Sequence, residues 1–176
     1  MKIGVFGSAA GDMNSSLLEK ARELGREIAN RGHIIVTGAC TGLPYEAVKG
    51  ARSAGGKSIG FSPGKDLKYH KENYGFPEDA ADKIIFTGLS KKGRNVISVE
   101  DAEASVFISG RIGTLNEFTI AYDSGKIMGV LTGTGGAADM IKDIVEKLKK
   151  KTSGVVIYES DPAKLIKKIT EAGCRK

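Results

Sequence analysis

Short runs rich in valine and isoleucine alternate with segments of helical period along the chain, and this alternation constrains the fold more than any other feature. Because a helical segment separates each run from the next, neighbouring runs pair parallel within a buried sheet. The expected strands are residues 3–6, 34–37, 58–62, 83–86, 104–108, 127–131 and 155–158. The sequence therefore predicts an α/β fold: a doubly wound, mainly parallel sheet of about seven strands with helices on both faces.

The segments between these runs predict helices with recognisable ends. Ser16 and Glu19 have the spacing of a capping box at the first helix, and Gly32 follows its end. Further helices are expected over residues 44–54, 89–101, 115–124 and 137–150, and a last one follows Asp161 and Pro162. Residues 62–82 interrupt the rhythm, and we expect a long functional loop there.

The chain of 176 residues, 40% hydrophobic and 27% charged, is long enough for one domain over residues 1–176 with a sizeable core. No charged leader with an apolar segment and no membrane-spanning run is evident, so we expect a cytoplasmic protein without membrane contact. The two cysteines, Cys40 and Cys174, have no metal-binding spacing, so we expect neither a disulfide framework nor a metal site.

The net charge of +6 favours an anionic ligand. It does not favour nucleic acid, because many lysines lie on the polar faces of the two C-terminal helices among acidic residues, and only 6% of residues are aromatic. Two nucleotide signatures are also excluded. The first turn lacks the GxGxxG pattern of dinucleotide folds, and Gly55-Gly56-Lys57-Ser58 leads into a strand where a P-loop opens a helix. We expect no cofactor, since no lysine is marked as a Schiff-base former either.

Glycines gather at the turns that follow four strands, in residues 7–8, 38–42, 110–113 and 133–136. In a parallel sheet these turns share one edge, where ligands bind, so they predict a single pocket. The turn over residues 109–117 is the most informative. Its glycines and the start of a helix suit a phosphate, and Glu117 lies one turn into that helix. Thr114-x-x-Glu117 also fits a capping box, which leaves a structural role for Glu117 open.

Gly93-Arg94-Asn95 followed by residues 109–117 resembles the paired motifs of the LOG proteins, the cytokinin riboside 5′-monophosphate phosphoribohydrolases often labelled lysine decarboxylase-like. These proteins form part of the SLOG superfamily of Rossmann-like domains and are related to molybdenum-cofactor carrier proteins. The resemblance implies Arg94 and Glu117 as the catalytic pair. It implies phosphate or nucleotide contacts for Gly7, Ser8, Gly38, Thr41, Gly42, Gly110, Arg111, Gly113 and Thr114.

The chain departs from the LOG motif at two positions, with Ser109 in place of a proline and Arg111 in place of a glycine. Because arginine adopts a positive φ less readily than glycine, the loop is expected to change shape at Arg111, which would contact a phosphate or fill part of the pocket. The resemblance implies hydrolysis of the N-glycosidic bond of a nucleoside 5′-monophosphate, and assembly as a homo-oligomer. The alternatives are a carrier or sensor of a phosphorylated nucleotide cofactor and a structural subunit with a vestigial pocket.

A few other side chains are candidates on chemical grounds. Cys40 lies in a glycine turn without a histidine to activate it, so we expect a small contact residue. His70 is a better functional candidate than His33, although the simpler expectation for it is a surface histidine. The aromatic residues of the 62–82 segment either stack on a base or pack that segment onto its neighbours; they are Tyr69, Tyr74 and Phe76.

Overall fold

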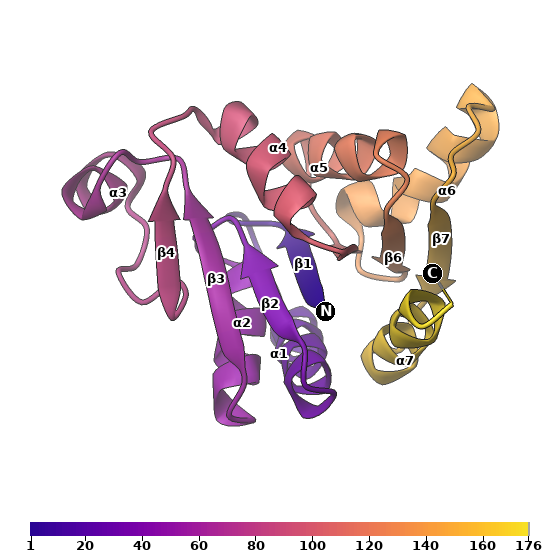
Figure 1. The fold of residues 1–176 in the computed structure, drawn as a ribbon, viewed down its shortest axis with the longest axis horizontal. Helices are drawn as coiled ribbons and strands as arrows, with labels where there is room; N and C mark the ends of the chain where they lie inside the picture. The colour runs from indigo at the N-terminus through magenta and orange to yellow at the C-terminus, as the bar shows by residue number, and fades with distance from the viewer. Residues whose placement is uncertain (176) are drawn as a thin grey trace.

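In the computed structural model, which describes residues 1–175, seven strands form one parallel sheet in the order β4-β3-β2-β1-β5-β6-β7 (Figure 1). The strands are β1 (Lys2–Gly7), β2 (Ile34–Thr37), β3 (Lys57–Ser62), β4 (Lys83–Phe86), β5 (Ala104–Ile108), β6 (Ile127–Leu131) and β7 (Val155–Glu159). The predicted fold class is confirmed, and β2, β4, β5 and β6 have the predicted bounds.

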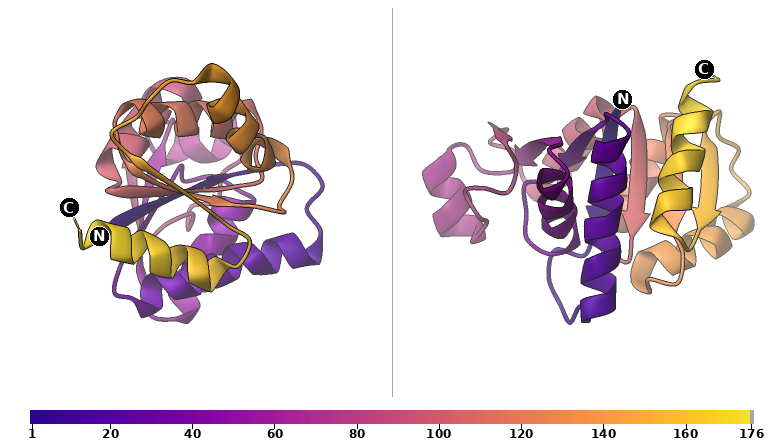
Figure 2. Two further views of the ribbon diagram at one scale, coloured as in Figure 1. Left: turned by 90° about the vertical axis from the view of Figure 1, so that its right-hand side faces the viewer. Right: turned by 90° about the horizontal axis from the view of Figure 1, so that it is seen from below.

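Helices cover both faces of this sheet, as the edge-on view in Figure 2 shows. They are α1 (Ser15–Asn30), α2 (Leu43–Ser53), α3 (Leu67–Tyr74), α4 (Lys91–Asp101), α5 (Ile112–Asp123), α6 (Gly136–Leu148) and α7 (Pro162–Gly173). Helices α1, α2 and α7 pack on one face and α4, α5 and α6 on the other, while α3 lies beyond the edge strand β4 (Figures 1 and 2). No helix within residues 1–175 is long and apolar enough to span a membrane.

The two faces bury different side chains. Aliphatic residues such as Ile3, Leu24 and Leu165 fill the layer beneath α1, α2 and α7. Aromatic rings occupy the other layer, where Phe107 stacks on Phe6 at 6.0 Å and meets Phe118 edge-on at 5.3 Å between ring centroids. Each large side chain contributes about 1.5–3 kcal/mol when fully buried, so this packing fixes α5 against β1, β5 and β6.

Strands β2 to β4 lie on one side of β1 and strands β5 to β7 on the other, so the strand order reverses between β1 and β5. Strand β1 pairs with β2 on one side and with β5 on the other, and Gly7 lies opposite Ile108. The turns that leave these two strands therefore lie side by side at the carboxyl edge of the sheet. In open α/β sheets this switch point is where ligands bind.

Two local predictions are wrong. The segment 62–82 is not a plain loop, because α3 occupies its middle, with Asp66 Oδ1 accepting a hydrogen bond from Tyr69 N at 2.7 Å and Gly75 ending it at φ 63°. The first helix is capped by Asn14, whose Oδ1 accepts from Leu17 N at 2.8 Å, and not by Ser16. In both places a short polar side chain satisfies an otherwise free N–H group of the first turn.

Candidate functional site

A cavity of about 400 Å³ opens at the switch point, between the turns after β1, β2 and β5, the first turns of α4 and α5, and the end of α3. Most of the side chains and turns predicted for the site line it: Gly7, Ser8, Gly38, Thr41, Arg94, Arg111, Gly113, Thr114 and Glu117. The structure therefore brings together residues that lie more than a hundred positions apart in the sequence.

The start of α5 provides free hydrogen-bond donors at this cavity. The helix begins at Ile112, three residues earlier than predicted, so Gly113 and Thr114 belong to its first turn. Within residues 1–175, the N–H groups of Ile112, Gly113 and Thr114 donate to no acceptor. These amides and the positive end of the helix dipole suit an anion.

Gly42 and Gly110 do not line the cavity, although both were predicted as ligand contacts. The Gly110 N–H is already used, because it donates to Ser8 Oγ at 3.1 Å, and at φ 91° the Thr114 side chain packs where a Cβ of residue 110 would stand. Gly42, at φ 73°, lets the chain pass close to the Ser8 carbonyl. Both glycines shape the turns that hold other residues at the cavity.

The glycine turn over residues 133–136 does not line the cavity, but it is hydrogen-bonded to the turn after β5, which does. At the start of α6, Ala137 N donates to Gly110 O at 2.8 Å and Ala138 N to Ser109 O at 2.9 Å. Thr134 Oγ1 accepts from Ser109 N at 2.9 Å. We expected four glycine turns at one ligand pocket, and this is wrong for the turn over residues 133–136. That turn instead holds the turn over residues 109–113 in place through these hydrogen bonds.

The departures from the LOG motif have a different effect from the one expected. Arg111 has a φ of −129°, which any residue adopts, so its side chain imposes no unusual backbone at this position. Ser109 has a φ of 50°, in the left-handed region. Proline is locked near −65°, so the turn differs from a proline-containing loop at Ser109, and not at Arg111 as predicted.

Arg94 and Glu117 form a buried ion pair across the cavity wall, with Arg94 Nη1 3.4 Å from Glu117 Oε1. Their side chains are 7% and 10% exposed. The guanidinium lies directly over Gly38, where an added Cβ would stand 2.2 Å from Nη1, so the absence of a side chain at Gly38 makes room for it. Arg94 Nε has no hydrogen-bond partner within residues 1–175, which leaves one buried donor unsatisfied.

Burial raises the pKa of Glu117 to about 7, and the nearby charge of Arg94 opposes this rise only in part. Asn95, next to Arg94 on α4, places its side-chain amide 3.1 Å from Glu117 Oε1 and donates to it when its nitrogen faces the carboxylate. The capping-box alternative for Glu117 is wrong, because Arg111 is the N-cap residue and no side chain caps α5. A carboxyl that titrates near neutral pH can exchange a proton with a ligand.

Sequence reasoning missed two cations at the site. Lys91 and Lys92 occupy the first turn of α4 and line the cavity with Arg94 and Arg111, against the single carboxylate of Glu117. No carboxylate within residues 1–175 pairs with Lys91, Lys92 or Arg111. Two lysines at the positive end of a helix with no acidic residue in its first turn were the available signal, since that position disfavours cations unless an anion joins them.

The remaining candidates have mainly structural surroundings. Cys40 lines the cavity as expected, but burial raises the pKa of its thiol to about 11 and keeps it protonated. His33 bonds the Thr170 hydroxyl at 3.0 Å. His70 is fully buried, so the surface position considered for it is wrong. Tyr74 and Phe76 line the cavity, whereas Tyr69 does not.

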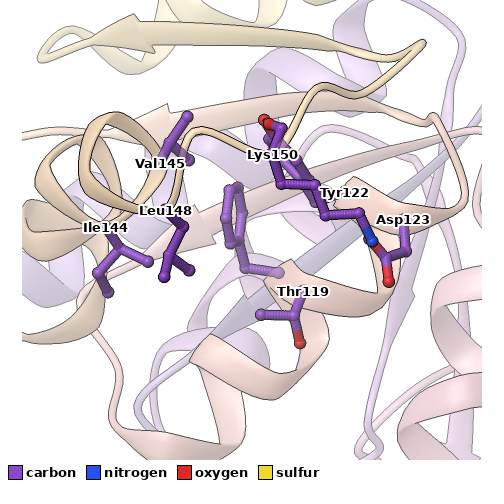
Figure 3. Close-up of a pocket in the computed structure, with 8 residues that line it drawn as sticks. Thr119, Tyr122, Asp123, Ile144, Val145, Leu148 and Lys150 are labelled. Atoms are coloured by element: carbon purple, nitrogen blue, oxygen red, sulfur yellow. The ribbon is translucent and has the colours of Figure 1, made fainter.

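A second hollow, of about 200 Å³, lies between α5 and α6 (Figure 3). Its wall is largely apolar, with Phe118 and Tyr122 from α5 facing Val145 and Leu148 from α6. It contains none of the predicted site residues. The polar cavity at the switch point therefore remains the candidate site.

Comparison with known proteins agrees with this geometry. A model described as LDcluster4, SLOG cluster4 family, matches residues 1–166. The chain belongs to the SLOG cluster4 family. The resemblance predicted from the motifs is thus confirmed at the level of the family.

Three of the similar proteins carry names that describe a function. A cytokinin riboside 5′-monophosphate phosphoribohydrolase of Mycobacterium tuberculosis is 31% identical over 120 residues, which span 68% of this chain and 61% of that protein. The molybdenum cofactor carrier protein of Chlamydomonas reinhardtii is 29% identical, with a TM-score of 0.79 over 98% of both chains. The molybdenum cofactor binding protein of Rippkaea orientalis is 26% identical, with a TM-score of 0.78 over 97% of this chain and 96% of its own.

Proposed function

We propose that the cavity binds a phosphorylated nucleotide and that the protein hydrolyses the N-glycosidic bond of a nucleoside 5′-monophosphate. The observation that carries this proposal is the buried Glu117, with a pKa of about 7, beside Arg94 and one helical turn from the free amides of Gly113 and Thr114. The phosphate would bind those amides, with Thr114 and Arg111 nearby. The anomeric carbon of the ribose would then lie near the carboxylate.

The reaction needs few groups from the protein. As the bond between C1′ and the base nitrogen breaks, positive charge develops at C1′, and ionised Glu117 stabilises it. The base nitrogen takes the electron pair of the broken bond, and Glu117 takes a proton from water as the hydroxide adds to C1′. That proton passes through solvent to the base nitrogen, which leaves Glu117 ionised again. Arg94 keeps part of the Glu117 population ionised at neutral pH because its charge opposes the effect of burial on the pKa. The products are the free base and ribose 5-phosphate.

A second candidate function is a carrier that holds a phosphorylated cofactor unchanged. The excess of cavity cations over carboxylates favours it, because Lys91, Lys92 and Arg111 exceed what one phosphate neutralises. The names of the two molybdenum-cofactor proteins support it as well. In either function, the proposed ligand is a small molecule and not nucleic acid.

We also propose that the protein forms a homo-oligomer. Exposed apolar side chains on α4, α5 and α6, among them Val96, Ile112 and Met140, are compatible with self-association.

Incubation with AMP, followed by chromatography for free adenine, separates the two functions. The enzyme proposal predicts adenine and ribose 5-phosphate in equal amounts, with release abolished in Glu117→Gln while AMP binding persists. Binding of AMP without any release of base, in the native protein, would contradict hydrolysis and support the carrier. Failure of AMP and of nucleoside 5′-monophosphates with other bases to raise the melting temperature would contradict nucleotide binding altogether.

A further inference from the structure

Two aromatic rings at the end of α3 form one corner of the cavity. Tyr74 is half-buried and Phe76 is buried, and their rings stack with centroids 5.5 Å apart at 20°. Gly75 makes this arrangement possible, because its φ of 63° turns the chain back at the end of the helix. Tyr74 thus keeps exposed surface at the cavity wall while Phe76 supports it from within.

This corner is held rigidly by polar contacts of the same segment. The buried His70 ring packs edge-on against Phe76 at 5.5 Å, its Nε2 donates to Pro77 O at 3.0 Å, and its Nδ1 lies 2.8 Å from Ser62 Oγ. Because a carbonyl only accepts, Nε2 carries the proton and Nδ1 accepts from the Ser62 hydroxyl. The corner is therefore preorganised from the side of α3.

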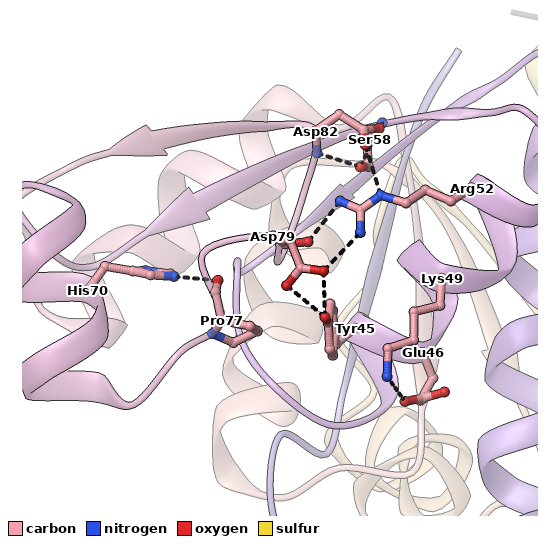
Figure 4. A network of polar contacts seen from close by, with 9 residues as sticks. All are labelled: Tyr45, Glu46, Lys49, Arg52, Ser58, His70, Pro77, Asp79 and Asp82. Carbon is pink, nitrogen blue, oxygen red and sulfur yellow. Dashed lines mark hydrogen bonds and ion pairs between the residues drawn. The ribbon is translucent and has the colours of Figure 1, made fainter.

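The other end of the segment is anchored to α2. Figure 4 shows Arg52 donating to the Asp79 carbonyl at 2.8 Å and Tyr45 donating to the Asp79 carboxylate at 2.7 Å. Arg52 also pairs with Asp82 at 2.9 Å, and Asp82 accepts from the Ser58 backbone at 2.8 Å. Binding at the aromatic corner would thus require little ordering of this segment, which lowers the entropic cost.

Lys91 completes the corner. Its ammonium lies 5.5 Å from the Tyr74 centroid and 5.7 Å from the Phe76 centroid, and no carboxylate within residues 1–175 pairs with it. An ammonium only donates hydrogen bonds, so it can contact acceptor atoms on the edge of a ligand ring. In DNA recognition, lysine pairs in the same way with O6 and N7 of guanine.

The aromatic corner and the anion site lie on different helices, each one turn before its member of the Arg94–Glu117 pair. Lys91 and Arg94 are one turn apart on α4, a rise of about 5 Å, and Glu117 lies one turn after Gly113 on α5. The Arg94–Glu117 pair is therefore about one turn from the aromatic corner and one turn from the amides. A ligand with a ring at one end and a phosphate at the other would place its sugar at Glu117.

We infer that Tyr74, Phe76 and Lys91 form the binding subsite for a planar heterocycle with acceptor atoms on its edge, of the oxopurine or pterin class. The inference rests on the proposed binding of a phosphorylated ligand and applies equally to the enzyme and to the carrier. The ring stacks on Tyr74, and Lys91 donates to its carbonyl oxygen. An amino group in the position of that carbonyl offers Lys91 no acceptor.

The test is calorimetric titration of the whole protein with three ligands: inosine 5′-monophosphate, AMP and ribose 5-phosphate. We expect inosine 5′-monophosphate to bind several-fold more tightly than AMP and at least tenfold more tightly than ribose 5-phosphate. Tyr74→Leu keeps apolar volume but removes the ring face. It lowers the affinity for inosine 5′-monophosphate about tenfold and leaves the affinity for ribose 5-phosphate unchanged. Lys91→Met reduces the preference for the inosine ligand over AMP to about onefold.

The matched control is Tyr158→Leu, the same change at a half-buried ring on β7, at the opposite edge of the sheet and outside the cavity wall, which alters none of the three affinities. Equal affinity of the native protein for inosine 5′-monophosphate and ribose 5-phosphate overturns the ring subsite. So does an equal loss for both ligands in Tyr74→Leu, because that result means that Tyr74 contributes no affinity specific to the heterocycle. Failure of all three ligands to bind the native protein is a different result, and it overturns the proposed function itself.

Discussion

Replacing Glu117 with glutamine is expected to stabilise the protein above neutral pH. The folded protein holds the pKa of this carboxyl at about 7, against an ordinary value of 4.5, because burial disfavours the charged form. The folded state therefore binds the proton more tightly than the unfolded state, so stability falls as pH rises from about 4.5 to 7 and stays lowered above that. Glutamine keeps the shape and the acceptor oxygen for Arg94 but carries no charge.

The magnitude follows from the pKa difference of about 2.5 units. At about 1.4 kcal/mol per unit, the free energy of unfolding of Glu117→Gln exceeds that of the native protein by about 3 kcal/mol at pH 8.5, and the difference vanishes near pH 4. Urea denaturation at intervals between pH 4 and pH 9 measures this difference directly.

A matched control has the opposite sign. The Lys168 ammonium and the backbone N–H groups of Ser160 and Asp161 lower the pKa of Glu159 to about 2, so Glu159→Gln removes stability above pH 4.5. Parallel stability curves for the native protein and Glu117→Gln across the pH range would refute the reasoning, because they would mean that Glu117 titrates as an ordinary exposed carboxyl.

Three further predictions concern the turns and thiols. With a thiol reagent at pH 8, the exposed Cys174 reacts at once and Cys40 reacts only on unfolding, since the pKa of Cys40 is about 11; two rapidly reacting thiols would contradict its burial. Ser109→Pro loses at least about 2 kcal/mol of stability in urea, because φ 50° and the N–H donated to Thr134 both exclude proline; an unchanged midpoint would contradict this turn geometry. Gly110→Ala is destabilised by a similar amount because its Cβ would stand 2.3 Å from Thr114 Oγ1, and a melting temperature within 1 °C of the native value would be inconsistent with that contact.

The sheet was predictable because its central strands are buried on both faces. Residues 34–37 and 104–108 are almost uninterrupted apolar runs, and no amphipathic helix shares that pattern. The start of α5 was misplaced because Gly113 was assigned to the turn, although glycine is tolerated in the first turn of a helix. Helix α3 was missed because it is short and polar, even though Asp66 and Gly75 carry its end signals.

Most residues of the site could be predicted from the sequence, but which of them line the cavity and which only shape the turns could not. Arg94 and Glu117 were found from their motifs, and the structure places them in contact. The Gly110 N–H donates to Ser8 Oγ because of the register of β1 against β5, and no local sequence pattern contains that register. Whether Tyr74 faces the cavity depends on α3 and on the turn after it, so the sequence left that question open.

The most direct test of the central claim is a titration of ¹⁵N-labelled protein with ribose 5-phosphate, followed by nuclear magnetic resonance of the backbone amides. The account predicts that the amide signals of Ile112, Gly113 and Thr114 shift most, because their N–H groups are the free donors at the cavity. Saturable shifts confined to other parts of the chain, with these three signals unmoved, would contradict the claim that the first turn of α5 binds the anion.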